Sequence, residues 1–211
     1  MLLDVKKSIL SGIMIAFGCS VYLSCVDKNL AWLGAFLFSA GLFTICEYGF
    51  NLYTGKVGYI AFHFSDIKYI FLTFLILFFN LLTTFVLGFF IGKYFDAVHI
   101  VALKIYLAKF SVSFWKLFIS GILCGILMYL SVDTWKRGAK IGCFIYIPLF
   151  ILCGFDHSIA NSFYNGAALG DHTFTLQNLF IVLVVILGNA VGGMLFPILT
   201  RSWKNESELN T

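Results

Sequence analysis

The chain has 211 residues, of which 61% are hydrophobic and 11% charged, and its net charge is +4. Soluble proteins contain roughly a quarter charged residues, so this composition excludes an ordinary water-soluble domain. The shortage of charge runs along the whole chain, which predicts that lipid surrounds most of it.

Six apolar stretches are each close in length to the ~20 residues that a helix needs to cross a bilayer. They lack the alternation of membrane strands, so we predict an all-α membrane protein with six spans. The expected spans are 9–26, 31–50, 70–91, 114–132, 141–153 with a continuation, and 176–199. A signal peptide is the alternative for the first span, but no small-residue cleavage site follows it.

The basic residues predict the orientation in the membrane, because cytoplasmic loops carry an excess of Lys and Arg. Nine lie on the side of the termini and five lie opposite, which places both termini in the cytoplasm. The nine are Lys6, Lys7, Lys56, Lys68, Lys136, Arg137, Lys140, Arg201 and Lys204, and the five are Lys28, Lys93, Lys104, Lys109 and Lys116. The +4 charge therefore gives no argument for nucleic-acid binding. The six cysteines lie in or beside the spans without metal-type spacing and are expected to pack as small apolar residues.

Two matches at one offset indicate an internal duplication. The tripeptide Ser-Gly-Ile at 11–13 recurs 109 residues later at 120–122, and Asn80 recurs as Asn189 at the same offset. Each unit holds three spans, an odd number, so the second copy must be inverted relative to the first. We expect one transmembrane domain over 1–211, with repeat one at about 7–92 and repeat two at about 114–200.

The middle span of each unit is interrupted by glycines and polar residues. The first apolar run stops at 49–56 (Gly-Phe-Asn-Leu-Tyr-Thr-Gly-Lys), and the second stops at 154–161 (Gly-Phe-Asp-His-Ser-Ile-Ala-Asn). Polar backbone at membrane depth is costly unless it lines a cavity walled by protein. The two breaks are therefore the candidate substrate site.

The second break resembles the fifth-helix signature of the formate/nitrite transporter family. The run Leu-Tyr-Thr-Gly at 52–55 is similar to the family's broken second helix, and 187–193 resembles its sixth-helix element. Together these elements follow the family's order over essentially the whole chain. The resemblance implies an aquaporin-like protomer with broken second and fifth helices, a homopentamer with one pore per protomer, and a place in the cell inner membrane.

The resemblance also assigns roles to residues. His157, Asn161 and Thr54 would form the polar centre of the pore, and Lys109 would be a vestibule lysine. One hydrophobic constriction would consist of Phe38, Leu42 and Phe150, and the other of Leu52 and Tyr53. Each has a plainer alternative: a satisfied buried histidine, a helix-capping threonine, an ordinary loop lysine, and packing or lipid-facing apolar residues.

These residues suggest how a small monovalent anion would cross. Lys109 would attract it, and protonation would neutralise it before the apolar constriction, where an unpaired charge is costly. His157 could relay a proton or serve as a fixed polar donor, since its ordinary pKa lies near neutrality. Thr54 and Asn161 could hydrogen-bond the substrate in either protonation state. Formate, nitrite and hydrosulfide all fit this description, and the Tyr-Thr-Gly-Lys variant is similar to the hydrosulfide branch.

Other residues and functions are left open. Asn80 and Asn189 are expected to join helices by hydrogen bonds, and Glu47 could snorkel or pair with a lysine. His63, His99 and His172 fall in loop-like stretches. A membrane enzyme would need Asp156, His157 and Ser158 to be catalytic, although neighbours in sequence rarely converge in that way. A neutral-solute channel would not explain the vestibule lysine, and no cofactor or metal motif is present.

Overall fold

The computed structural model describes residues 1–209, with side chains to residue 200, and every regular element in that range is helical. The all-α prediction is confirmed for this part of the chain, whereas the side chains of Arg201 and Lys204 lie outside it. Four helices are long and apolar enough to cross a membrane, and two shorter apolar helices accompany them. The long ones are α1 (Leu2–Asp27), α4 (Ile67–Tyr94), α6 (Phe114–Lys136) and α9 (Leu176–Leu209), and the shorter ones are α2 (Ala31–Glu47) and α7 (Gly142–Leu152).

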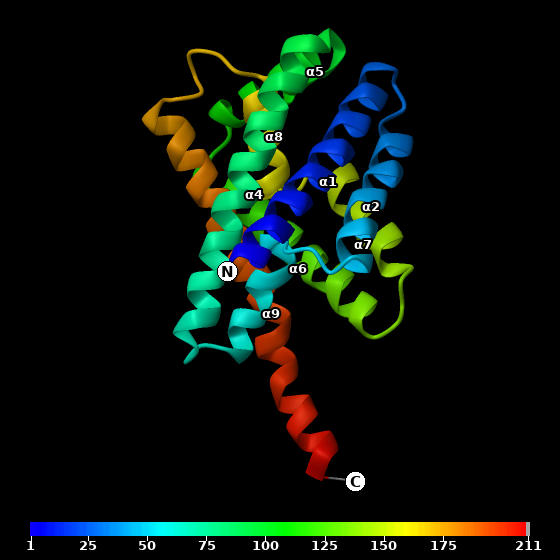
Figure 1. Ribbon diagram of the computed structural model, residues 1–211, viewed down its shortest axis with the longest axis vertical. Coiled ribbons are helices and arrows are strands. Elements are labelled where there is room, and N and C mark those ends of the chain that lie inside the picture. The colour runs from blue at the N-terminus through cyan, green and yellow to red at the C-terminus, as the bar shows by residue number, and fades with distance from the viewer. Residues whose placement is uncertain (210–211) are drawn as a thin grey trace.

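The remaining elements are short helices that follow or join the longer ones. They are α3 (Tyr53–Lys56), the 3₁₀ helix η1 (Val57–Phe62), α5 (Asp96–Leu107), the 3₁₀ helix η2 (Ala108–Ser111) and α8 (Ser158–Ala167). The turn after α1, the α4–α5 junction and the segment before α9 lie at one end of the molecule (Figure 1). The η1–α4 turn, the α6–α7 loop and the end of α9 lie at the other end. The loops thus fall into the same two groups as in the count of basic residues.

Both interrupted helices end in the same way, at the glycines that the sequence singled out. Gly49 and Gly154 have φ of 62° and 71°, a region that glycine enters without steric cost. The next amide bonds back to the helix, from Phe50 to the Ile45 carbonyl and from Phe155 to the Phe150 carbonyl, each at 2.9 Å. These bonds are the mark of a Schellman ending, which stops a helix and turns the chain.

The chain resumes as short helices that pack against the other half of the molecule. The α8 helix, from the second half, packs against α4 and α5 of the first, and η1, from the first half, packs against α9. Glycines permit this close approach: a Cβ at Gly88 in α4 or at Gly166 in α8 would collide with the facing helix backbone. The two breaks are therefore held where the halves of the chain interlock.

Two histidines assigned to loops have defined surroundings. The prediction for His99 was wrong, because it lies in α5 and its Nδ1 is 2.7 Å from the Ala167 carbonyl oxygen. His63 follows η1, and its ring stacks on Tyr69 with centroids 4.5 Å apart. All six cysteines are free thiols.

Candidate functional site

The two breaks meet through one hydrogen bond between buried side chains. Thr54 Oγ1 lies 2.8 Å from His157 Nε2, although 103 residues separate them in the sequence. Thr54 stands in the first turn of α3, and His157 is the residue immediately before α8. Thr54 and His157 are 1% and 2% exposed, so water does not compete for this contact. The structure thus brings together two of the three residues expected at the polar centre.

The hydrogen bonds of His157 indicate which ring nitrogen carries the proton. Its Nδ1 accepts a hydrogen bond from the Ala160 backbone N–H at 3.1 Å, which caps the start of α8. A neutral imidazole has one donor and one acceptor nitrogen, so Nε2 carries the hydrogen and donates it to Thr54. The Thr54 hydroxyl hydrogen then remains available for another acceptor. His157 thus caps α8 and bonds Thr54, so both of its ring nitrogens have partners, as expected of a satisfied buried histidine.

Two phenylalanines cover His157 on one side. The Phe150 ring stacks on the imidazole with centroids 5.7 Å apart, and the Phe38 ring meets Phe150 edge-on at 6.4 Å. Phe38 and Phe150 are both buried, at 1% and 2% exposure. The imidazole therefore has an apolar ring against this face, and a second apolar ring lies next to the first.

A cavity of about 80 Å³ lies beside these rings and collects most of the predicted residues. Phe38, Phe150, His157 and Asn161 line it, together with Lys109 from η2. The predicted vestibule lysine therefore opens on the same small space as the histidine. The volume suits a few water molecules or a small anion.

Lys109 does not stand alone in this cavity, because its ammonium group pairs with Asp156. The same carboxylate accepts hydrogen bonds from Ser120 Oγ at 2.7 Å and from Asn161 Nδ2 at 3.0 Å. The Asp156 backbone N–H in turn donates to Ser120 Oγ at 2.9 Å. An anion in this cavity would therefore meet a lysine whose charge is already compensated.

Asp156 and Ser120 were not predicted as parts of this site. Asp156 was considered only as a member of a catalytic set, and Ser120 only as part of the internal repeat. The signal for Asp156 was its place inside the eight-residue run 154–161, next to the histidine. Nothing local marked its pairing with Lys109, because 47 residues separate the two.

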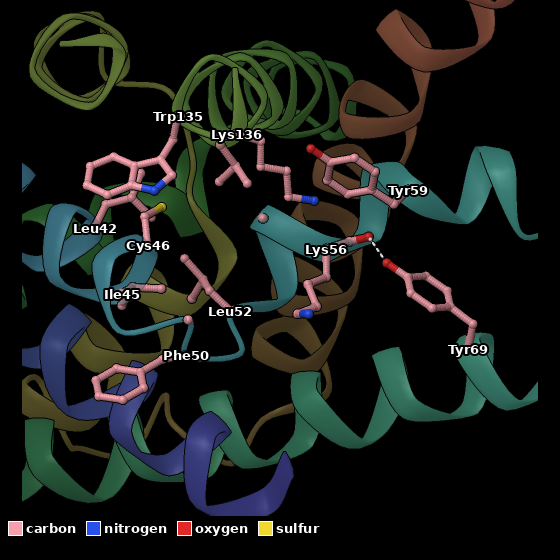
Figure 2. A pocket seen from close by; sticks show the side chains of 13 residues that line it. Leu42, Ile45, Cys46, Phe50, Leu52, Lys56, Tyr59, Tyr69, Trp135 and Lys136 are labelled. Atoms are coloured by element: carbon pink, nitrogen blue, oxygen red, sulfur yellow. Dashed lines mark hydrogen bonds between the residues drawn. The ribbon is translucent and has the colours of Figure 1, made fainter. Parts of the chain in front are cut away.

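The other predicted constriction residues lie apart from the phenylalanines. Leu42 and Leu52 line a second cavity of about 160 Å³, shown in Figure 2, which shares no lining residue with the first. Leu42 thus lines the same cavity as Leu52, whereas Phe38 and Phe150 line the other, although all four belong to one buried apolar cluster. Tyr53 lines neither cavity; its hydroxyl donates to the Ile186 carbonyl of α9 at 3.5 Å, the long limit of a hydrogen bond.

Asp156, His157 and Ser158, the residues that a membrane enzyme would need as a catalytic set, do not hydrogen-bond to one another. Asp156 binds Lys109 and Ser120, and His157 binds Thr54. The Ser158 hydroxyl is buried and has no hydrogen-bond partner among the residues whose side chains are described. This arrangement does not form a chain of nucleophile, base and orienting group.

Glu47 pairs with a lysine, which is the second of the two alternatives that the sequence suggested for it. Its Oε2 accepts a hydrogen bond from Lys140 Nζ at 2.7 Å, and both side chains are about half exposed. This pair links the end of α2 to the loop before α7, at the surface.

One family model matches this chain, and two solved structures have a similar fold. Residues 5–203 match the family model described as formate/nitrite transporter. The fold is similar to a solved FNT family ion channel, with a TM-score of 0.82 at 19% identity over 96% of this chain and 90% of that one. It is also similar to a structure described as a pentameric formate channel with formate bound, with a TM-score of 0.72 at 23% identity over 99% and 96% of the two chains. Comparison with curated protein sequences finds no match.

Proposed function

Because the chain belongs to the formate/nitrite transporter family, we propose that it is a membrane channel for a small monovalent anion or its weak acid. Formate, nitrite and hydrosulfide are the candidate substrates. The observation that carries this proposal is the contact between Thr54 and His157, which joins the two broken helices between two separate cavities. A buried polar contact between two spaces of molecular size is what a narrow pathway for a small polar solute requires.

We propose that the pathway runs through six spans arranged as two inverted repeats. In this plan α2 with α3, and α7 with α8, are the interrupted second and fifth spans. The matching Schellman endings at Gly49 and Gly154 support it. The assembly is a homopentamer in the inner membrane with both termini in the cytoplasm. The solved pentameric formate channel supports the pentamer and formate as a substrate.

The substrate crosses the apolar part of the pathway as a neutral acid. A charge at membrane depth costs about 2.5–3.5 kcal/mol even on the mildest scales, and protonation removes most of that cost. Lys109 shares its charge between Asp156 and the arriving anion, and the acid then passes between Phe38 and Phe150. Beyond this cavity, the Thr54 hydroxyl can donate a hydrogen bond to the substrate in either protonation state, because the bond from His157 Nε2–H leaves the hydroxyl hydrogen free.

The experiment that tests this function is uptake by liposomes that contain the purified protein. Formate, nitrite and hydrosulfide are offered separately at two external pH values. We expect uptake of at least one to exceed that of empty liposomes and to increase as the external pH falls, because more of the substrate is then protonated.

Two variants at His157 separate its polar role from its capping role. His157→Asn keeps a side-chain acceptor for the start of α8 but cannot take up a proton, whereas His157→Ala loses both functions. We expect both to change uptake sharply and only the alanine variant to lower the Tm as well. If none of the three substrates moves faster than through empty liposomes, the channel assignment fails for these substrates.

A further inference from the structure

The cavity beside Leu42 and Leu52 has two sides of different character. Aliphatic side chains, including those of Leu42 and Leu52, line one side, and Lys56, Lys136 and Tyr59 lie on the other (Figure 2). Tyr69 in the first turn of α4 and Lys136 in the last turn of α6 border it. It therefore opens toward the end of the molecule that holds the η1–α4 turn and the α6–α7 loop (Figure 1). The Lys109 cavity, bordered by η2, belongs to the opposite half of the pathway.

The two lysines of this cavity differ from Lys109 in having no carboxylate partner. Among residues 1–200, neither Lys56 nor Lys136 forms an ion pair, and neither ammonium group donates a hydrogen bond. Lys136 Nζ lies 3.5 Å from the centroid of the Tyr59 ring, a cation–π contact that leaves the charge uncompensated. Lys56 is held from its backbone, since the Tyr69 hydroxyl donates to its carbonyl at 3.0 Å.

The acidic groups near these lysines have other partners. Asp133 lies one turn before the end of α6 and bonds to Arg137 Nε at 2.7 Å. Asp4 bonds to the N-terminal amine at 3.1 Å and to Asn51 Nδ2 at 3.3 Å. The Tyr59 hydroxyl at this end is buried and has no hydrogen-bond partner among the residues whose side chains are described. The cavity thus combines two cations that form no ion pair among residues 1–200, a hydroxyl without a hydrogen-bond partner there, and apolar side chains on the opposite side.

We propose that this cavity is a second anion-binding vestibule, in which Lys56 and Lys136 hold the permeating monovalent anion on the side of Leu52. This inference rests on the proposed function and adds a site to it. The two vestibules then differ in kind. On the Lys109 side the anion competes with Asp156 for the ammonium group, whereas on the Lys56 side it meets two ammonium groups that form no ion pair among residues 1–200.

The test is the concentration dependence of transport in liposomes for the variant with Lys56→Gln and Lys136→Gln together. Glutamine keeps much of the side-chain length, so packing against the cavity wall is retained while the charge is removed. Lys68→Gln is the matched control, because Lys68 lies at the same end of the molecule but lines a different pocket. Lys56→Arg keeps the charge, so its half-saturating anion concentration is expected to lie closer to that of the wild type than that of Lys56→Gln does.

We expect the double variant to need roughly three- to tenfold more anion for half-maximal flux, the range for losing two half-solvated charge contacts. The maximal flux should remain close to that of the wild type. Half-saturation at the wild-type concentration in the double variant would overturn the proposal. A rise of the same size in Lys68→Gln would do so too, because it would reveal a general surface-charge effect.

Anionic lipid headgroups could occupy the same two cations, so the lipid composition is varied as well. The measurement is made in neutral phosphatidylcholine vesicles and in vesicles with added phosphatidylglycerol. An effect seen only with the anionic lipid would overturn the proposal in favour of a lipid site.

A binding measurement tests the vestibule even if the protein transports none of the anions. If the wild type moves no anion, the proposed function has failed, and the vestibule is then judged by chemical protection. Nitrite should protect Lys56 and Lys136, but not Lys68, from an amine-reactive reagent. Equal labelling of Lys56 and Lys136 with and without nitrite would refute the site.

Discussion

Asn80 and Asn189 hold the starts of the two short helices with matching hydrogen bonds. The Asn80 Oδ1 atom accepts from the Tyr53 N–H, and the Asn189 Oδ1 atom accepts from the Ser158 N–H, each at 2.8 Å. Each Nδ2 donates to the carbonyl two residues earlier in the break, Asn51 at 3.1 Å and Asp156 at 2.8 Å. Each also donates to another helix, at 2.8 Å in both cases. The prediction that these amides join helices is confirmed, and they do so at equivalent points of both breaks.

Replacing either asparagine should destabilise the protein and stop transport. Asn80→Ala and Asn189→Ala each leave buried backbone groups without partners, at a cost of about 1–3 kcal/mol per group. Gln177→Ala is the control, since Gln177 also donates to a backbone carbonyl, that of Phe110 at 3.1 Å, but its side chain is exposed. Thermal unfolding in detergent should show a clearly lower Tm for the first two variants. Unchanged Tm values for both would contradict the structural role.

The hydroxyl of Thr54 should matter more than its methyl group. Thr54→Val keeps the shape but leaves the Nε2–H of His157 buried and unpaired, whereas Thr54→Ser keeps the hydrogen bond. An unpaired buried donor costs about 1–3 kcal/mol. We expect a large loss of flux in the valine variant and a small one in the serine variant. Equal fluxes in the two would show that the hydroxyl has no part in conduction.

Removing one charge of the Lys109–Asp156 pair should destabilise the protein more than removing both charges. The lysine and aspartate side chains are 13% and 9% exposed, and a buried pair that loses one partner typically costs about 3–5 kcal/mol. We therefore expect Lys109→Met to be less stable than the double variant with Asp156→Asn. A double-mutant cycle on Tm measures the coupling, and additive effects of the two changes would argue against a pair.

A methyl group at Gly192 should disturb the crossing of α6 and α9. A Cβ there would collide with the Ile122 carbonyl oxygen, and overpacking of this kind costs about 1–3 kcal/mol. Gly192→Ala should therefore lower the Tm, whereas Gly170→Ala, in the loop before α9, should change it little. A Tm equal to that of the wild type for Gly192→Ala would mean that the helices separate there at low cost.

The surface ion pair of Glu47 and Lys140 should contribute little to stability or to transport. Exposed ion pairs are worth about 0–1 kcal/mol, and both of these side chains are about half exposed. Glu47→Gln should therefore retain wild-type flux and nearly wild-type Tm. A strong loss of flux would instead assign Glu47 a part in conduction that its position does not suggest.

The sequence predicted the features that depend on local chemistry. The helix endings at Gly49 and Gly154 follow from the need for positive φ, and the partners of Asn80 and Asn189 follow from the cost of bare polar groups in lipid. Helix α5 was missed because Asp96, His99 and Lys104 made the segment look like a loop. Its buried face, formed by Val98, Val101 and Ala102, does have helical spacing and could have revealed it.

Features that depend on tertiary contacts were harder to predict from the sequence. The meeting of Thr54 with His157 was expected only from the family resemblance, since no local pattern brings two residues together across half the chain. The pairing of Lys109 with Asp156 depends on where η2 lies relative to α8. Leu42 lies one helical turn beyond Phe38 in α2. That turn places Leu42 at the second cavity, whereas Phe38 lines the first.

The interlocking of the two halves sets the order in which the protein can be completed during synthesis. Chains are made from the N-terminus, so α3 and η1 are made well before α6 and α9, against which they pack. Until then, the faces of α3 and η1 that pack against α6 and α9 lack their partners, although Asn80 of α4 can already bond the Tyr53 N–H and the Asn51 carbonyl. The α8 helix, by contrast, finds α4 and α5 already in place. The first half of the chain must therefore wait for the last helix before Thr54 can take its final position opposite His157.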